Sequence, residues 1–165
     1  MAVVTTKSGV ITNRDATPKV LNNAAISGGG IKSFAGTLEA VSGDSIGSVY
    51  IMGSIPSNAR VHQVLALCDA ITTCAADVGI YDTTANGGAV VDADFFASAQ
   101  SLASALTGTD VTHESGVYGV EDIEKPLWEA LGLTSDPCKM YDIAYTLTAA
   151  AGSAGTVSLK VTYAL

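Results

Sequence analysis

Charged residues are scarce in this chain: they make up 15% of its 165 residues, against roughly 25% in an average soluble domain. A free monomer usually carries more charge to stay soluble. The shortage therefore favours either a tightly packed β protein with a Ser/Thr surface or a subunit whose surface is largely covered by neighbours. Aromatic residues are also few, at 6%, so Ala, Val, Leu and Ile supply most of the apolar content.

Basic residues are too few and too dispersed for nucleic-acid binding. The eight Lys and Arg side chains are scattered singly along the chain, whereas phosphates require a basic stripe. The net charge is −8, which suits a basic protein patch as a partner or keeps the subunit soluble before assembly. We therefore expect no nucleic-acid partner.

Cysteine pairs, membrane spans and export signals are missing too. Cys68, Cys74 and Cys138 contain no C-x-x-C pair, which excludes a disulfide framework and a zinc knuckle. Cys68 and Cys74 could pair across a hairpin, but buried free thiols are the favoured interpretation. No run approaches the roughly 20 apolar residues of a membrane span. Residues 1–15 lack an apolar core behind positive charge, so we expect synthesis in the cytoplasm without a secretory signal and no membrane partner.

Histidines and paired carboxylates are the first residues to test for chemistry. His62 lies in a strand pattern, and His113 precedes Glu114 without the H-E-x-x-H of a zinc site. Asp92 and Asp94 are the closest approach to a calcium site, but the Gly and the terminal Glu of such a loop are missing. A hairpin end followed by a helix cap is the simpler interpretation of this pair.

The remaining acidic residues also favour structural roles. Glu121, Asp122 and Glu124 lie beside Lys125 in a predicted loop, where no aromatic platform for a sugar is near. We interpret them as a solvated loop or a patch that meets a basic partner. The single Trp128 is expected to pack in a short helix. Three further aspartates flank strands and are interpreted as turn carboxylates: Asp69, Asp77 and Asp82. The sequence predicts no enzyme, catalytic residue, cofactor or metal.

The first 30 residues differ from the rest of the chain. They are polar, rich in Asn, Thr and Ser, and end in three consecutive glycines, residues 28–30. Their apolar residues are too sparse for a core element, which indicates an extended arm. The arm is either a mobile tail or a segment that becomes ordered on a neighbouring subunit, by docking its Val/Ile pairs or adding a strand. We expect an arm over residues 1–30 and one domain over residues 31–165.

Short strands separated by turns follow residue 30. The final strand is the clearest, because Val157, Leu159, Val161 and Tyr163 alternate with polar residues. Asn86-Gly87 predicts a hairpin turn. Strands are predicted over residues 34–41, 45–55, 60–68, 76–81, 89–91, 140–147 and 157–163. Residues 94–106 predict a short amphipathic helix or an ordered loop, residues 111–120 a strand or a projecting loop, and residues 126–133 one or two helical turns.

Seven or eight such strands predict an all-β fold. The expected architecture is an antiparallel β-sandwich, jelly-roll-like, with one or two short helices and an extended N-terminal arm. Long excursions between strands favour a jelly roll over an immunoglobulin-like sandwich, whose Cys…Trp…Cys spacing is also absent.

Several segments between residues 45 and 165 carry a resemblance to a known family. They read PSNARVHQVLALCDAI, AADVGIYD, GGAVVDADFFASA, KPLWEALGL and YDIAYTLTAAAGSAGTVSLKVTY. This pattern resembles small head-associated proteins of tailed bacteriophages, namely decoration or cement proteins. The likeness is one of pattern, because no catalytic signature anchors it, and it assigns no contact residues. The polar arm before Gly28 matches less well.

The resemblance implies a function for the chain. Members of the family are β-sandwich subunits that stabilise the head by bridging major capsid proteins, as dimers or trimers. It implies a virion structural protein on the capsid exterior, with the major capsid protein and copies of itself as partners. The alternative is a phage fiber, tail or carbohydrate-binding module with the same sandwich. That module should show an exposed aromatic patch or an ordered cation, and Tyr81, Tyr118 and Trp128 are the only plausible suppliers.

Overall fold

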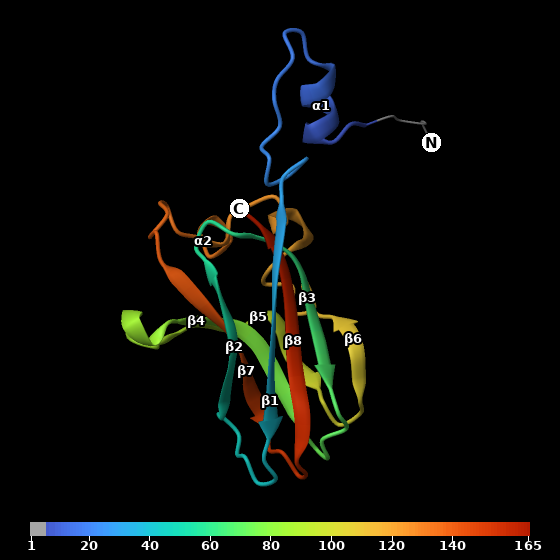
Figure 1. Ribbon diagram of the computed structural model, residues 1–165, viewed down its shortest axis with the longest axis vertical. Coiled ribbons are helices and arrows are strands. Elements are labelled where there is room, and N and C mark those ends of the chain that lie inside the picture. Colours follow the sequence, from blue (N-terminus) through green and yellow to red (C-terminus); the bar gives the residue numbers. More distant parts are fainter. Residues whose placement is uncertain (1–5) are drawn as a thin grey trace.

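The computed structural model describes residues 6–165 and arranges eight strands in two antiparallel sheets packed face to face (Figure 1). Sheet I has the order β1-β8-β3-β6 and sheet II the order β2-β7-β4-β5. The strands are β1 (Ile31–Ala40), β2 (Val49–Pro56), β3 (Arg60–Cys68), β4 (Ala75–Asp82), β5 (Val90–Ser101), β6 (Leu106–Asp110), β7 (Met140–Ala149) and β8 (Gly155–Ala164). Two short helices, α1 (Gly9–Asp15) and α2 (Leu127–Ala130), and two 3₁₀ turns complete the elements.

The order of the strands is that of a jelly roll. Neighbours within a sheet are distant in sequence: β1 pairs with β8 along its whole length, from Ile31 opposite Ala164 to Ala40 opposite Gly155. Eight strands that share two four-stranded sheets in this way form the double-sheet jelly roll. The prediction of an all-β, jelly-roll-like sandwich is confirmed.

The core lies between the two sheets and explains the alternating patterns. Val157, Leu159 and Val161 of β8 are fully buried, as are most odd-numbered residues of β7. The rings of Phe95 and Phe96 meet edge-on at 5.0 Å between centroids. Burying an aromatic or branched side chain of this kind stabilises a fold by roughly 1.5–3 kcal/mol. Cys68 and Cys74 are buried free thiols, as predicted, and Cys138 is exposed.

Two glycines mark places where backbones come too close for a side chain. A Cβ at Gly36 of β1 would lie 2.0 Å from the carbonyl oxygen of Met52 in β2. A Cβ at Gly79 of β4 would lie 2.2 Å from two carbonyl oxygens of β5. Glycine inside a strand therefore lets β1 cross β2 and lets a bulge of β5 fold over β4.

The predicted helix over residues 94–106 is wrong. Most of this segment belongs to β5, whose pairing with β4 shifts register three times. The bulges bury the consecutive residues Phe95 and Phe96 together, and they hold Ala99 at a φ of +50°. A strand interrupted by bulges loses its period of two, so its apolar spacing imitates that of a helix. Strand β6 was not predicted because it contains a single large apolar residue, Leu106.

Three other local predictions hold. Residues 111–120 form a loop, which was one of their two alternatives. The helical turn α2 follows Pro126, and Gly132 ends it at a φ of +76°. Gly87 has a φ of +103° in the turn between β4 and β5, as the hairpin prediction requires.

Residues 6–30 lie outside both sheets and project beyond one end of the sandwich (Figure 1). They include α1, although the sequence predicts an extended segment there. This helix is seven residues long and buries none of them. Because it has no buried face, the sequence shows no apolar periodicity that would predict it. None of the helices in residues 6–165 is long and apolar enough to span a membrane.

Candidate interaction surfaces

The two histidines occupy structural positions. His113 lies flat against Tyr118, 5.2 Å between ring centroids, and its Nδ1 is 2.9 Å from the Tyr118 carbonyl oxygen. Glu114 accepts a hydrogen bond from the backbone N–H of Ser98 at 2.8 Å. His62 lines a small hollow of about 110 Å³ at the base of the arm, where its Nε2 is buried without a hydrogen-bond partner. The structure thus separates the histidines instead of gathering them.

The aspartates flanking the strands pin turns and bulges. Asp69 accepts the N–H of Thr156 at 3.0 Å, and Asp77 accepts that of Ala99 at 2.7 Å. Asp82 forms an ion pair with Lys139. These contacts account for all three carboxylates as parts of the framework.

Asp92 and Asp94 lie in β5, so the helix cap expected for them is wrong. Asp92 accepts the backbone N–H of Asp94 at 3.3 Å across a bulge. Burial raises the pKa of Asp92, and the neighbouring Asp94 carboxylate adds to that rise. Across the described part of the chain, no three His, Cys, Asp or Glu side chains are grouped to hold a metal ion.

The acidic cluster of residues 121–125 is divided between a half-buried ion pair and an exposed edge. Asp122 is buried and accepts Lys125 Nζ at 2.7 Å and the Gly119 N–H at 3.0 Å. Burial alone would raise the pKa of Asp122, but these two donors outweigh it and hold that pKa low. Glu121 and Glu124 remain exposed. The loop therefore presents acidic side chains on a braced backbone.

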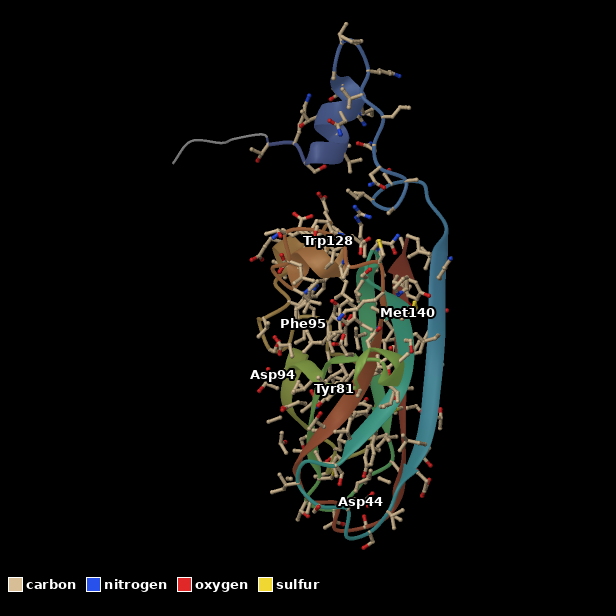
Figure 2. All side chains as sticks on the ribbon, turned by 90° about the vertical axis from the view of Figure 1, so that its left-hand side faces the viewer. Asp44, Tyr81, Asp94, Phe95, Trp128 and Met140 are labelled. Atoms are coloured by element: carbon tan, nitrogen blue, oxygen red, sulfur yellow. The ribbon has the colours of Figure 1, made fainter. Side chains whose placement is uncertain are left out.

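The aromatic residues that a sugar-binding module would need are withdrawn from the surface. Tyr81 and Tyr118 are buried, and Trp128 is half-buried at the end of the sandwich nearest the arm (Figure 2). The Tyr118 hydroxyl donates 2.9 Å to the carbonyl of Val61. Stacking on a sugar requires an open ring face, which Tyr81 and Tyr118 do not offer.

The outer face of sheet I is polar. Thr37 of β1 and Ser158 of β8 share a hydrogen bond of 2.8 Å, and Thr156 donates to Glu39 at 2.9 Å in the next row. Because Val157 and Leu159 point into the core, Thr156 and Ser158 point outwards. This face has the cross-strand hydroxyl pairs typical of a solvated sheet.

The outer face of sheet II exposes apolar side chains on its two edge strands, β2 and β5. Ile51 of β2 is 54% exposed and lies opposite Ala144 of β7, which is fully buried and in turn lies opposite Gly79 of β4. Val90 of β5 is also exposed and pairs with Tyr81 on the same face. The sequence reasoning missed this face, because only the pairing of four distant strands brings these residues together.

A third surface lies on the loop between β6 and β7, where Val120 and Ile123 are exposed beside Glu121 and Glu124. We call residues 120–124 the loop surface. The alternation of apolar and acidic residues is visible in the sequence, and it was interpreted there only by its charge.

No protein-family model matches the chain, and no curated protein matches its sequence. Solved structures do match. A chain from the capsid of Ralstonia phage GP4 has a TM-score of 0.55 at 16% identity, covering 82% of this chain and 84% of that one. A chain from the capsid asymmetric unit of cyanophage Pam1 has a TM-score of 0.52 at 17% identity, with the same coverage.

The chain thus shares its fold with chains from phage capsids. A further match, from the acid-stable capsid of Helicobacter pylori bacteriophage KHP30, has a TM-score of only 0.43 at 16% identity, over 81% of this chain and 87% of that one. In the GP4 and Pam1 capsids the matched chains are similar to this one in length, because nearly equal shares of both chains align.

Proposed function

We propose that this protein is a virion structural protein, a decoration or cement subunit on the exterior of a phage head. The observation that carries the proposal is the likeness of fold, over most of the chain, to chains in two phage capsids. The jelly roll itself recurs in viral capsid domains and also in lectins and cupins. The pattern resemblance of residues 45–165 to head-associated proteins adds the decoration role.

The size of the chain supports a subunit added to a shell. The GP4 and Pam1 matches are chains of about this length that also occur in capsids. A single jelly roll that carries little charge can be covered by neighbours without desolvating many ionic groups. The apolar outer face of sheet II is the surface we expect to meet the major capsid protein, since apolar burial drives most protein association.

The mechanism we propose is thermodynamic. A subunit that binds the closed shell and not its dissociated parts stabilises the closed state by about 2.7 kcal/mol when its free concentration is 100 times Kd. An interface of roughly 800 Å² per partner is enough for specific binding. Repeated over the head, these increments raise the temperature and pressure that the shell withstands.

A structural role also accounts for the polar residues better than catalysis does. His113, Asp69, Asp77, Asp82 and Asp122 are each engaged in holding a loop, turn or bulge. A catalytic site would instead bring a nucleophile, a base and an oxyanion donor to one hollow. We therefore propose that the protein is not an enzyme.

The test is reconstitution on heads from which this protein has been removed. Purified protein should rebind at a fixed stoichiometry, appear as added density on the outer surface in electron cryo-microscopy, and raise the temperature at which heads release DNA. Failure of the folded protein to bind would contradict the proposal.

Two matched variants sharpen the reconstitution. Ile51→Lys adds a charge to the outer face of sheet II, and Ala35→Lys adds the same charge to the outer face of sheet I. We expect Ile51→Lys to lower occupancy at least tenfold and Ala35→Lys to leave it unchanged. The reverse pattern, with occupancy lowered by Ala35→Lys and unchanged by Ile51→Lys, would assign the shell contact to sheet I.

A further inference from the structure

Charge is distributed unevenly between the arm and the sandwich. Residues 1–30 hold three of the eight basic residues, Lys7, Arg14 and Lys19, and one of the sixteen acidic residues, Asp15. Their net charge is +2, which leaves −10 on residues 31–165. The basic arm of one copy is therefore attracted electrostatically to the acidic sandwich of another copy.

The arm carries apolar side chains that its own chain leaves uncovered. Leu21 is 93% exposed and Val20 51% exposed, directly after Lys19. The fold of the arm depends on polar contacts, chiefly a 2.9 Å hydrogen bond from Asn13 to Asn22. Among residues 6–165, no salt bridge joins the arm to the sandwich. Polar contacts within the arm thus give it its shape, and its apolar residues Val20 and Leu21 lie in solvent.

The arm also keeps an excess of positive charge. Lys7 Nζ and Arg14 Nε both lie 2.8 Å from the same carboxylate, that of Asp15. One acidic group therefore serves two cations, and both hydrogen bonds lower the pKa of Asp15. Lys19 forms no ion pair in the described part of the chain. The local charge beside Val20 and Leu21 is positive.

The loop surface is the apolar and acidic counterpart of these arm residues. Val120 is 72% exposed and Ile123 37% exposed, in and just after a 3₁₀ turn. The turn spans Val120–Asp122, and Val120 and Ile123 are both exposed close to the exposed Glu121 and Glu124. Apolar and acidic side chains therefore share this surface.

The backbone beneath the loop surface is held in place. Asp122, between the exposed residues, points inwards to Lys125 and the Gly119 N–H. The buried Tyr118 hydroxyl lies 3.2 Å from the Asp122 carbonyl oxygen as well as 2.9 Å from that of Val61. A braced surface loses little conformational entropy when a partner binds it.

We propose that the arm of one copy docks on the loop surface of a second copy. Val20 and Leu21 cover Val120 and Ile123, and the Lys19 and Arg14 side chains meet Glu121 and Glu124. Docking within one chain does not achieve this. Within one chain, Glu124 lines a hollow together with six arm residues, Gly9, Val10, Asn13, Asn22, Asn23 and Ile26, yet Leu21 stays 93% exposed.

Exchange of arms in this manner is a head-to-tail contact, which closes into a ring of copies when the rotation between them permits. The contact is small, so its value lies in raising the effective concentration of neighbours that share a surface. It goes beyond the proposed function, because it concerns copies in solution and needs no shell. Failure of the two proposals is therefore distinguishable.

The test is sedimentation of the full chain at about 50 µM in low salt. The arm-reversed variant is Arg14→Glu with Lys19→Glu, and the surface-reversed variant is Glu121→Lys with Glu124→Lys. Each alone should associate at least tenfold more weakly than the wild type. An equimolar mixture should recover association. The basic arm of the surface-reversed variant can bind the acidic surface of the arm-reversed variant, and the acidic arm of the arm-reversed variant can bind the basic surface of the other. Lys32→Glu with Lys160→Glu matches the charge change of the arm-reversed variant on sheet I and should associate like the wild type.

Three outcomes would overturn the proposal. They are a wild-type chain that stays monomeric, an arm-reversed variant that associates normally, and a mixture that remains monomeric although both variants are folded by circular dichroism. An arm-reversed variant that self-associates normally but no longer binds heads would assign the arm to the major capsid protein instead. That result also overturns arm exchange between copies.

Discussion

Phe96, Tyr145 and Val161 of the sandwich are completely buried, whereas in the arm, residues 6–30, only the small side chain of Ala25 is buried. Burial of apolar area is the main stabilising term in folding. The arm relies instead on exposed salt bridges and amide contacts, each of which contributes about 1 kcal/mol or less. From this comparison we expect the sandwich to fold by itself and the arm to require a partner for comparable order.

Charge follows the same division. The sandwich carries the acidic excess and the arm the basic one, so the part without a core is also the part that the rest of the molecule attracts. Substitutions in the two parts should therefore affect different measurements. The predictions below run from the largest expected change in stability to the smallest.

Replacing Phe96 with Ala should break the sandwich side of the comparison. Phe96 packs on Phe95 and on Tyr118 with centroid distances of 5.0 and 5.4 Å. Removing a buried aromatic ring costs about 3–5 kcal/mol, measurable by urea unfolding. Leu21→Ala is the matched change in the arm, and it should leave the unfolding midpoint unchanged. Equal losses in both variants would contradict the division.

Tyr118→Phe should weaken the loop surface with a smaller effect on the fold. It removes the hydroxyl that is hydrogen-bonded to the Val61 carbonyl and leaves that buried carbonyl without its donor. Burial, with the Asp122 charge adding to it, raises the pKa of Tyr118, so the hydroxyl stays protonated as a donor at neutral pH. We expect a loss of about 1–3 kcal/mol and faster amide exchange in residues 119–124. Unchanged exchange there would show that the hydroxyl does not brace the loop.

Asp92→Asn tests a place where burial in the sandwich is unfavourable. Because the folded pKa of Asp92 lies above its unfolded value, this group favours the folded state at low pH and loses that contribution as pH rises through the folded pKa. The amide keeps an acceptor for the Asp94 N–H. The variant should therefore be more stable than the wild type at pH 7. The difference should shrink as pH falls through the raised folded pKa of Asp92, and it should be gone below about 4, the unfolded value. A less stable variant at pH 7 would refute this account.

Deletion of residues 1–27 should have the smallest effect on stability. Among the described residues that are removed, 6–27, only Ala25 is buried, so we expect a change of less than about 1 kcal/mol in thermal unfolding. Attachment to heads should nonetheless weaken, because the contact between neighbouring copies is lost. Full occupancy of the truncated chain on purified heads would eliminate the role of the arm.

Local predictions succeeded where a residue pattern and its structural cause lie close together in sequence. The alternation in β8, the Asn86-Gly87 turn and the stop at Gly132 depend on neighbouring residues and on backbone dihedrals. The predictions for β5 and β6 failed because their causes are distant. The bulges of β5 arise from its pairing with β4, and β6 forms because its backbone pairs with the edge of β3.

The sequence by itself determined the all-β class, the polar arm, the scarcity of charge and the absence of recognisable catalytic motifs, since each is a property of composition or of period two. Only the tertiary structure decided which residues form surfaces. Ile51 lies opposite Ala144, which lies opposite Gly79 on the next strand. Val120 and Ile123 stay exposed because Asp122 and Tyr118 hold the loop from below. Such contacts are set by long-range register and bracing, which no local pattern records.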